Sequence, residues 1–292
     1  MRVSRSEKAR NSSPFAVGRS PKRKTTANGQ QPTANPIGIF DSGVGGLTVF
    51  REIARVVPDR PLIYLGDCAR VPYGTKSAEI VRRYSLQAAN HLLQRGIGML
   101  VVACNTATSA ALPALQEMLD IPVIGVIEPG ARAAAEKTRG RIGVIATEGT
   151  VSSRAYTKAI HQIKPSVEVI EAAAPLFVAL AEEGWANTHV AREVAEVYLE
   201  PLLDAGIDTL VLGCTHYPIL RGTIEHVVGD HVAVVDSAET TAECVREMID
   251  GNVAEGGGAT HTFLVTDAAE RFRRIASEFL EQEIERLELV SL

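Results

Sequence analysis

The fold is decided by two stretches of the chain, Val101-Val102-Ala103-Cys104-Asn105-Thr106 and Val211-Leu212-Gly213-Cys214-Thr215-His216. In each, a run of strand-forming apolar residues stops at a cysteine, and the two cysteines lie 110 positions apart. A strand that ends in this way presents its thiol at the edge of an α/β sheet where such folds bind ligands. Two thiols that face one carbon atom can remove a proton from one side and return it to the other. The repeat therefore predicts a site for racemisation or epimerisation.

From Pro36 onward, short apolar runs alternate with longer amphipathic stretches. The stretch from Ala78 to Arg95, for example, places apolar residues at helical spacing on one face. Strands that alternate with helices predict βαβ units and a mostly parallel sheet. The expected strands are Ile37–Phe40, Leu62–Leu65, Met99–Ala103, Pro122–Ile127, Arg141–Ala146, Val167–Ile170, Thr209–Gly213 and Val232–Val235.

A second repeat supports two similar halves. The strand Ile37–Phe40 enters Asp41-Ser42-Gly43, and 105 positions later Ile142–Ile145 enters Ala146-Thr147-Glu148-Gly149-Thr150. We predict two similar doubly wound α/β domains with mostly parallel sheets, related by a pseudo-twofold axis, and an active site in the cleft between them. The first domain comprises residues 36–130 plus 243–292, and the second comprises 131–242. The segment from His261 to Asp267 is expected to pack back onto the first half.

Composition indicates a globular enzyme rather than a membrane or nucleic-acid-binding protein. Apolar residues make up 46% and charged residues 22% of 292 residues, and no window of 18 consecutive apolar residues occurs. Residues 1–35 hold eight basic residues and one acidic residue, a net charge of +7, so the remaining chain carries −12. We expect a disordered basic leader over 1–35 and an acidic body that does not take nucleic acid as its main ligand. The leader lacks the apolar core of a secretory signal, and the four cysteines do not form a disulfide scaffold, so the chain is expected in a reducing intracellular compartment.

The stretch Asp41-Ser42-Gly43-Val44-Gly45-Gly46 follows a strand and precedes a helix that is expected to start near Leu47. Free N–H groups at such a turn attract a carboxylate or phosphate. As a dinucleotide fingerprint the stretch fails, because Thr48 stands where the third glycine belongs. Two interpretations remain open: a small-anion site with Asp41 as a base or an ammonium ligand, and a tight turn with Asp41 as a helix cap.

The two cysteines have different neighbours. Cys104 stands at the predicted start of a helix, which favours the thiolate and lowers the cysteine pKa. Cys214 lies two residues before His216, which can activate it. One of two carboxylates, Glu182 or Glu183, is expected to hold the histidine proton. Cys68 and Cys244 have no such neighbours and are expected to be structural. No lysine stands in a pyridoxal phosphate setting and no metal-ligand cluster occurs, so the predicted racemase needs no cofactor.

The sequence resembles that of the glutamate racemases. The resemblance runs in order from about residue 37 to 270 and rests on five motifs: Gly38–Val49, Tyr64–Gly74, Val101–Thr108, Val126–Gly130 and Leu212–Pro218. It implies a cofactor-independent two-base enzyme of the bacterial cytoplasm that supplies D-glutamate for peptidoglycan and commonly forms a homodimer. It also implies that no cell-wall precursor is required as an activator.

Carried over residue by residue, the resemblance assigns Cys104 and Cys214 as the two catalytic acid/bases, with Cys104 acting on D-glutamate and Cys214 on L-glutamate. Asp41 would assist Cys104, while Glu182 and His216 would assist Cys214. The substrate contacts implied by the resemblance are Asp41, Ser42, Tyr73, Gly74, Asn105, Thr106, Thr215 and His216. Departures from the family pattern, Cys68 for threonine and Ala174 for cysteine, touch no assigned role.

Three other interpretations remain. A related two-cysteine racemase for aspartate or hydantoins would share the cysteine pair but differ around the substrate pocket. A thiol-redox protein would pair the two cysteines. A catalytically idle amino-acid-binding module would keep its ligand affinity when Cys104 is replaced by serine.

Overall fold

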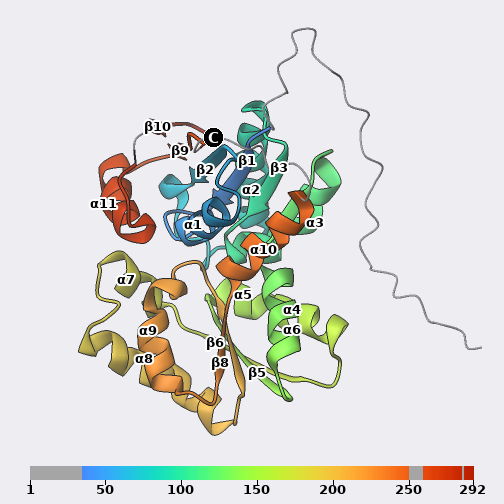
Figure 1. Ribbon diagram of the computed structural model, residues 1–292, viewed down its shortest axis with the longest axis vertical. Coiled ribbons are helices and arrows are strands. Elements are labelled where there is room, and N and C mark those ends of the chain that lie inside the picture. The colour runs from blue at the N-terminus through green and yellow to red at the C-terminus, as the bar shows by residue number, and fades with distance from the viewer. Residues whose placement is uncertain (1–34, 250–258, 285) are drawn as a thin grey trace, which may run out of the picture. The chain divides into compact units, whose positions relative to one another are not determined.

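We analysed a computed structural model of the chain, which describes residues 35–249, 259–284 and 286–292. The predicted leader, residues 1–35, lies outside the described residues except for Asn35. The described chain folds into an α/β structure with two sheets, in which every strand pairing is parallel, so the predicted fold class is confirmed (Figure 1).

The first sheet has six strands in the order β10-β9-β2-β1-β3-β4. Its central strand β1 is fully buried, as a parallel strand covered on both faces by helices must be. The strands are β1 (Ile37–Asp41), β2 (Leu62–Gly66), β3 (Met99–Val102), β4 (Val123–Gly125), β9 (Thr262–Val265) and β10 (Leu287–Leu289). The helices before the second sheet are α1 (Leu47–Val56), η1 (Cys68–Arg70), α2 (Ala78–Gln94), α3 (Asn105–Met118) and α4 (Ile127–Lys137).

The second sheet has four strands in the order β6-β5-β7-β8. They are β5 (Arg141–Ala146), β6 (Glu168–Ala173), β7 (Thr209–Gly213) and β8 (Ala233–Asp236). The remaining helices are α5 (Glu148–Ser153), α6 (Ala155–Ile163), α7 (Leu176–Glu182), α8 (His189–Asp204), η2 (Tyr217–Leu220), α9 (Arg221–Val228), α10 (Ser237–Ile249) and α11 (Ala269–Leu280).

The predicted strands are present, and most differ only at their ends. The largest difference is β6, which runs on to Ala173 because Ala172 and Ala173 pair with the end of β5. In the sequence these alanines stand in a continuous apolar run with the residues of α7, so no local signal marks where the strand ends. The segment from His261 does return to the first sheet, where β9 pairs with β2, and β10 adds an edge strand that was not predicted.

Two helices span the predicted domain boundaries, and the division into domains stays a prediction. Residue 130 lies inside α4, and residue 242 lies inside α10, which follows β8 of the second sheet and packs on α1 of the first (Figure 1). One continuous hydrophobic cluster contains β1 residues such as Ile39 together with β7 residues such as Leu212. No helix in the described parts of the chain is both long and apolar enough to cross a membrane.

Candidate active site

A cavity with an empty volume of about 500 Å³ lies where strand ends of the two sheets meet, and both Cys104 and Cys214 line it. Thirteen further residues complete its lining: Ser42, Gly43, Val71, Pro72, Tyr73, Gly74, Asn105, Thr106, Thr147, Val178, Glu182, Thr215 and His216. A larger hollow, of about 1030 Å³, lies between α1, α4 and α10 and contains Cys244 but neither of the two repeated cysteines.

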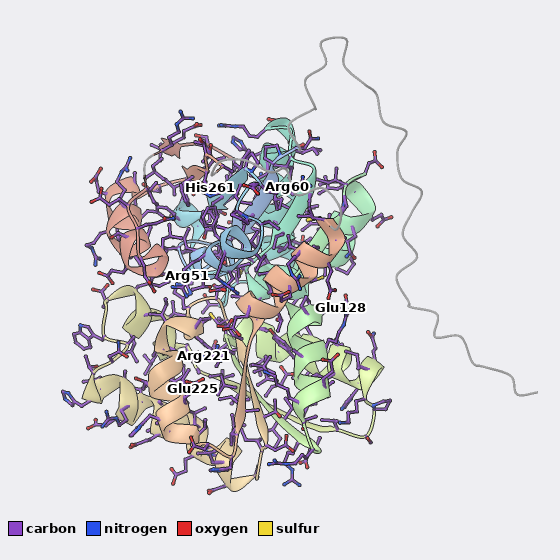
Figure 2. The ribbon with its side chains drawn as sticks, viewed as in Figure 1. Arg51, Arg60, Glu128, Arg221, Glu225 and His261 are labelled. Carbon is purple, nitrogen blue, oxygen red and sulfur yellow. The ribbon has the colours of Figure 1, made fainter. Side chains whose placement is uncertain are left out.

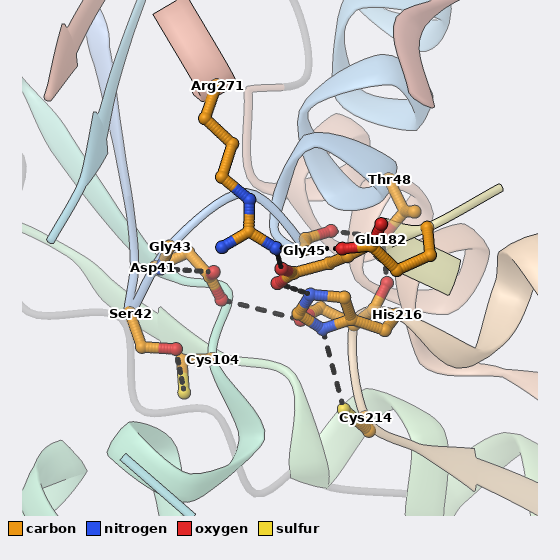
Figure 3. Close-up of polar contacts among 12 residues, drawn as sticks. Asp41, Ser42, Gly43, Gly45, Thr48, Cys104, Glu182, Cys214, His216 and Arg271 are labelled. Carbon is orange, nitrogen blue, oxygen red and sulfur yellow. Dashed lines mark hydrogen bonds and ion pairs between the residues drawn. The ribbon is translucent and has the colours of Figure 1, made fainter. Parts of the chain in front are cut away.

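Cys104 forms the N-cap of α3 directly after β3. Its Sγ accepts a hydrogen bond from the backbone N–H of Ala107 at 3.4 Å and donates one to the Ser42 hydroxyl at 3.6 Å (Figure 3). Burial, together with the nearby charge of Asp41, raises the pKa of the Cys104 thiol to about 12. The predicted lowering of this pKa by the helix N-terminus is therefore wrong, because desolvation outweighs the single N–H contact. Cys104 is a thiol at neutral pH.

Cys214 follows β7 and has a different set of partners. The Nδ1 atom of His216 lies 3.9 Å from its Sγ, and His216 Nε2 is 3.0 Å from Oε1 of Glu182 (Figure 3). Glu182 Oε2 in turn accepts a hydrogen bond from Arg271 at 2.9 Å. The structure thus distinguishes Glu182 from Glu183, since within the described chain Glu183 reaches only Arg271.

His216 is held in its protonated form. Burial alone would lower the pKa of His216, but the hydrogen bonds and charges of Cys214 and Glu182 outweigh it and raise the pKa to about 10. Burial likewise acts to raise the pKa of Glu182, and the hydrogen bond and charge of His216, helped by Arg271, bring it below its ordinary value. An imidazolium therefore lies between the sulfur and the carboxylate at neutral pH.

The glycine-rich turn binds its own carboxylate. Gly43 N–H donates to Oδ2 of Asp41 at 2.9 Å, while the first N–H groups of α1 donate to carbonyls of the turn. These N–H groups are therefore not free to bind an anion, and the small-anion site stays a prediction. The helix-cap alternative is wrong, because Gly46 is the N-cap of α1 and no side chain caps it.

Asp41 is completely buried and is not among the residues that line the cavity. Its Oδ1 faces the Thr215 hydroxyl at 3.5 Å, and burial raises its pKa, against the charge of His216 and the N–H donors of the turn. Asp41 thus acts on Cys104 through its charge rather than from the cavity wall.

The other predicted substrate contacts are brought together at the cavity. Ser42, Tyr73, Gly74, Asn105, Thr106, Thr215 and His216 all line it. The Tyr73 hydroxyl donates to Asp67, which also binds Arg70 and Thr266, so the aromatic wall is held from behind. Their roles toward a substrate stay predictions.

Sequence reasoning missed several residues of the site. Thr147, at the end of β5, lines the cavity and bonds the Thr106 hydroxyl at 2.8 Å across the two sheets. A signal was present, because Thr147 lies in the stretch that repeats the Asp41-Ser42-Gly43 landmark. Arg271 carries no such signal, since it lies 55 residues beyond His216 on an amphipathic helix.

Comparison with known proteins agrees with this geometry. The sequence model of the Asp/Glu/Hydantoin racemase family matches residues 37–245. The chain belongs to this family. A glutamate racemase of Geobacter metallireducens is 56% identical over 250 residues, which cover 84% of the chain and 92% of that relative.

Solved structures lead to the same family. The glutamate racemase isoform RacE1 of Bacillus anthracis has a TM-score of 0.86 at 41% identity, and that of Francisella tularensis, in complex with D-glutamate, has 0.83 at 36%. Each comparison covers 89% of the chain and 98% of the solved one. This member of the racemase family is therefore an isomerase, an amino-acid racemase.

Proposed function

We propose that the chain interconverts L- and D-glutamate through Cys104 and Cys214, without a cofactor. The observation that carries the proposal is that two buried thiols from equivalent strands line one cavity, each with a different proton environment. The choice of glutamate is supported by the relatives, which are glutamate racemases at up to 56% identity.

The two environments suit opposite tasks. In the L-to-D direction, the anionic sulfur of Cys214, stabilised by the His216 imidazolium, takes the α-proton and forms an S–H bond. The electron pair of the broken C–H bond passes toward the α-carboxylate. The Cys104 thiol then delivers its own proton to the opposite face of the carbon. The products are D-glutamate, a Cys104 thiolate and a Cys214 thiol, which is the form that accepts D-glutamate in the reverse reaction.

The carbanion left by removal of the α-proton must be stabilised, because the α-hydrogen of an amino acid is only weakly acidic. Hydrogen-bond donors on the cavity wall, the Thr106 and Thr215 hydroxyls and the Asn105 amide, can stabilise its negative charge. A well-placed donor of this kind contributes about 3 kcal/mol to the transition state. Burial of both cysteines keeps water from competing for the proton.

The test follows deuterium. Incubation with L-glutamate in D₂O, without pyridoxal phosphate, is expected to move the optical rotation to zero and to place deuterium in the D product. Cys104→Ala and Cys214→Ala should each lower racemisation by about 10³-fold or more. The losses must be equal in both directions, because the two enantiomers have the same free energy.

The variants also separate two half-sites: Cys104 with Ser42, and Cys214 with His216 and Glu182. Cys104→Ala retains the base for L-glutamate, so we expect slow α-proton exchange of L-glutamate alone, and Cys214→Ala should exchange only D-glutamate. Racemisation that survives either substitution unchanged contradicts the two-thiol proposal. Turnover of aspartate instead of glutamate would contradict the substrate.

We also propose, on the resemblance and on the glutamate racemases among the relatives, that the D-glutamate serves peptidoglycan synthesis and that the enzyme acts in the cytoplasm as a homodimer. Mass measurement in solution tests the dimer. Rescue of a D-glutamate-requiring bacterial strain tests the cellular role.

A further inference from the structure

The side chain of Asn105 has one end occupied and one end without a partner. Its Oδ1 accepts a hydrogen bond from the Tyr156 hydroxyl at 2.7 Å. Its Nδ2 is buried and has no hydrogen-bond partner among the residues that the structure describes, although Asn105 lines the cavity. A buried donor without an acceptor is unfavourable. A bound ligand that supplies an acceptor atom removes this penalty.

The Tyr156 hydroxyl is placed to fix which end of the Asn105 amide faces the cavity. An asparagine amide presents an acceptor on one side and two donors on the other, and a rotation of 180° exchanges them. Tyr156 is completely buried, and its ring lies against Gly130 and Gly213, so its hydroxyl is fixed in space. Burial raises the pKa of Tyr156, which keeps the hydroxyl protonated and able to donate.

The contact also joins the two sheets. Tyr156 lies on α6, which packs on β6 of the second sheet, while Asn105 lies on α3, which packs on β3 and β4 of the first. Asn105 directly follows Cys104, so its side chain is anchored next to one of the two reacting thiols.

We propose that Tyr156 is a positioning residue that orients the Asn105 amide so that Nδ2 donates to a carboxylate oxygen of the substrate. This inference rests on the proposed function, which places glutamate in the cavity. Tyr156 touches no substrate itself and acts through Asn105.

The test is a double-substitution cycle in the full-length chain. Tyr156→Phe removes the donor and is expected to raise KM for both enantiomers about tenfold, with kcat changed less than threefold. Asn105→Ala should raise KM at least as much. If Tyr156 acts only through Asn105, adding Tyr156→Phe to Asn105→Ala changes KM no further.

Two additional variants separate positioning from stability. Tyr217 is an equally buried tyrosine whose hydroxyl donates to the Ala174 carbonyl at 2.9 Å, so Tyr217→Phe should lower the melting temperature to a similar degree and leave KM unchanged. Asn105→Asp keeps the acceptor for Tyr156 but replaces the amide donor with a second acceptor. It should bind glutamate more weakly than Asn105→Ala, and it answers the question even if Tyr156→Phe does not fold.

The outcomes are distinct when calorimetric Kd values for D-glutamate accompany the kinetics. Penalties that are additive in the cycle, or an Asn105→Asp variant that binds as well as the parent, overturn the inference while leaving an active racemase. A parent enzyme that binds glutamate without turning it over overturns the proposed function, and the cycle is then read from Kd. A parent that neither binds nor turns over glutamate overturns both.

Discussion

The two cysteine half-sites begin alike and end differently. Both follow a buried parallel strand, but β3 leads directly into the 14-residue helix α3, while β7 leads into the short turn η2 and only then into α9. Cys104 therefore caps a helix and meets a hydroxyl and a backbone N–H. Cys214 instead meets His216. The strands set where the two sulfurs lie, and the connections that follow set which groups each sulfur contacts.

This difference supports the opposite roles that we propose for two identical side chains. Burial near Asp41 keeps Cys104 protonated at neutral pH, with a pKa of about 12. Beside Cys214 lies the positive imidazolium of His216, itself held by Glu182. Two thiolates beside one substrate repel each other, so only one sulfur of the pair is ionised at a time. An enzyme with two equal thiols would therefore lack a preferred resting state, since either sulfur could carry the charge.

The largest effect is expected when the second half-site is made to resemble the first. His216→Asn removes the imidazolium and should lower kcat/KM about 10²-fold, equally in both directions. In the parent, activity should fall as the pH rises through about 10, the pKa of His216, and the variant should lack this limb. The measurement is kcat/KM as a function of pH. His226→Asn, an exposed substitution on α9, is the control and should change nothing.

The same substitution changes stability with a defined sign. The pKa of His216 is raised from 6.5 to about 10 in the folded chain. Its contribution to the free energy of unfolding is therefore fully present below pH 6.5 and is lost as the pH rises through about 10. Denaturant unfolding of parent and variant should differ most at low pH and converge above 10. A constant difference across this range would contradict the assigned protonation of His216.

The sequence predicts the two strands and the two thiols well, because local signals carry them. An apolar run that ends in a cysteine is visible in consecutive residues, and its repetition makes it specific. The proton state of Cys104 does not follow in the same way: the predicted helix start is present, but the predicted sign of the pKa shift is wrong. Burial is a property of the whole fold, and it outweighs a local N–H contact.

The next largest effect is expected at Gly45, where the glycine-rich turn comes close to His216 and Thr215. A Cβ atom at Gly45 would lie 2.4 Å from both His216 Nδ1 and Thr215 Oγ1. His216 cannot move away cheaply, since it is held by Glu182 and packs edge-on against Phe279. Gly45→Ala should therefore lower the free energy of unfolding by about 1–3 kcal/mol. It should also reduce kcat about tenfold, because the ring is displaced from Cys214.

The control for this steric argument is a glycine with open space around it. Gly222 on α9 has no atom within 4 Å of an added Cβ, so Gly222→Ala should leave activity unchanged and stabilise the helix by up to about 1 kcal/mol. Stability comes from chemical unfolding and kcat from the racemisation assay. If Gly45→Ala keeps full activity, His216 is less firmly held than its contacts indicate.

Tyr156 and Arg271 have positions that no local sequence pattern predicts. Each contacts a residue of the cavity wall from a helix that is remote in sequence, and neither stands in a motif. Their contacts depend on how α6 and α11 pack, which no local pattern encodes. The same limit applies to Glu182 and Glu183, which are identical neighbours in the sequence. Which of them faces His216 is decided by how α7 packs and ends, not by residue type.

The smallest effect is expected at the outer end of the second half-site. Arg271→Gln removes the ion pair with Glu182, but Arg271 is about half exposed, so the pair is screened and contributes no more than about 1 kcal/mol. Burial raises the pKa of Glu182, while His216 and Arg271 lower it. Without Arg271 this pKa rises, and the loss of activity at acid pH should begin at a higher pH than in the parent. The effect on kcat/KM at neutral pH should stay below about fivefold.

Two controls test whether this effect comes from the charge of Arg271. High salt should shift the pH profile of the parent toward that of the variant, because it screens the same charge. Arg246→Gln, which removes an equally exposed arginine paired with Glu243 on α10, should leave the pH profile in place. If both arginine variants shift it alike, the effect comes from net charge, and the second half-site ends at Glu182.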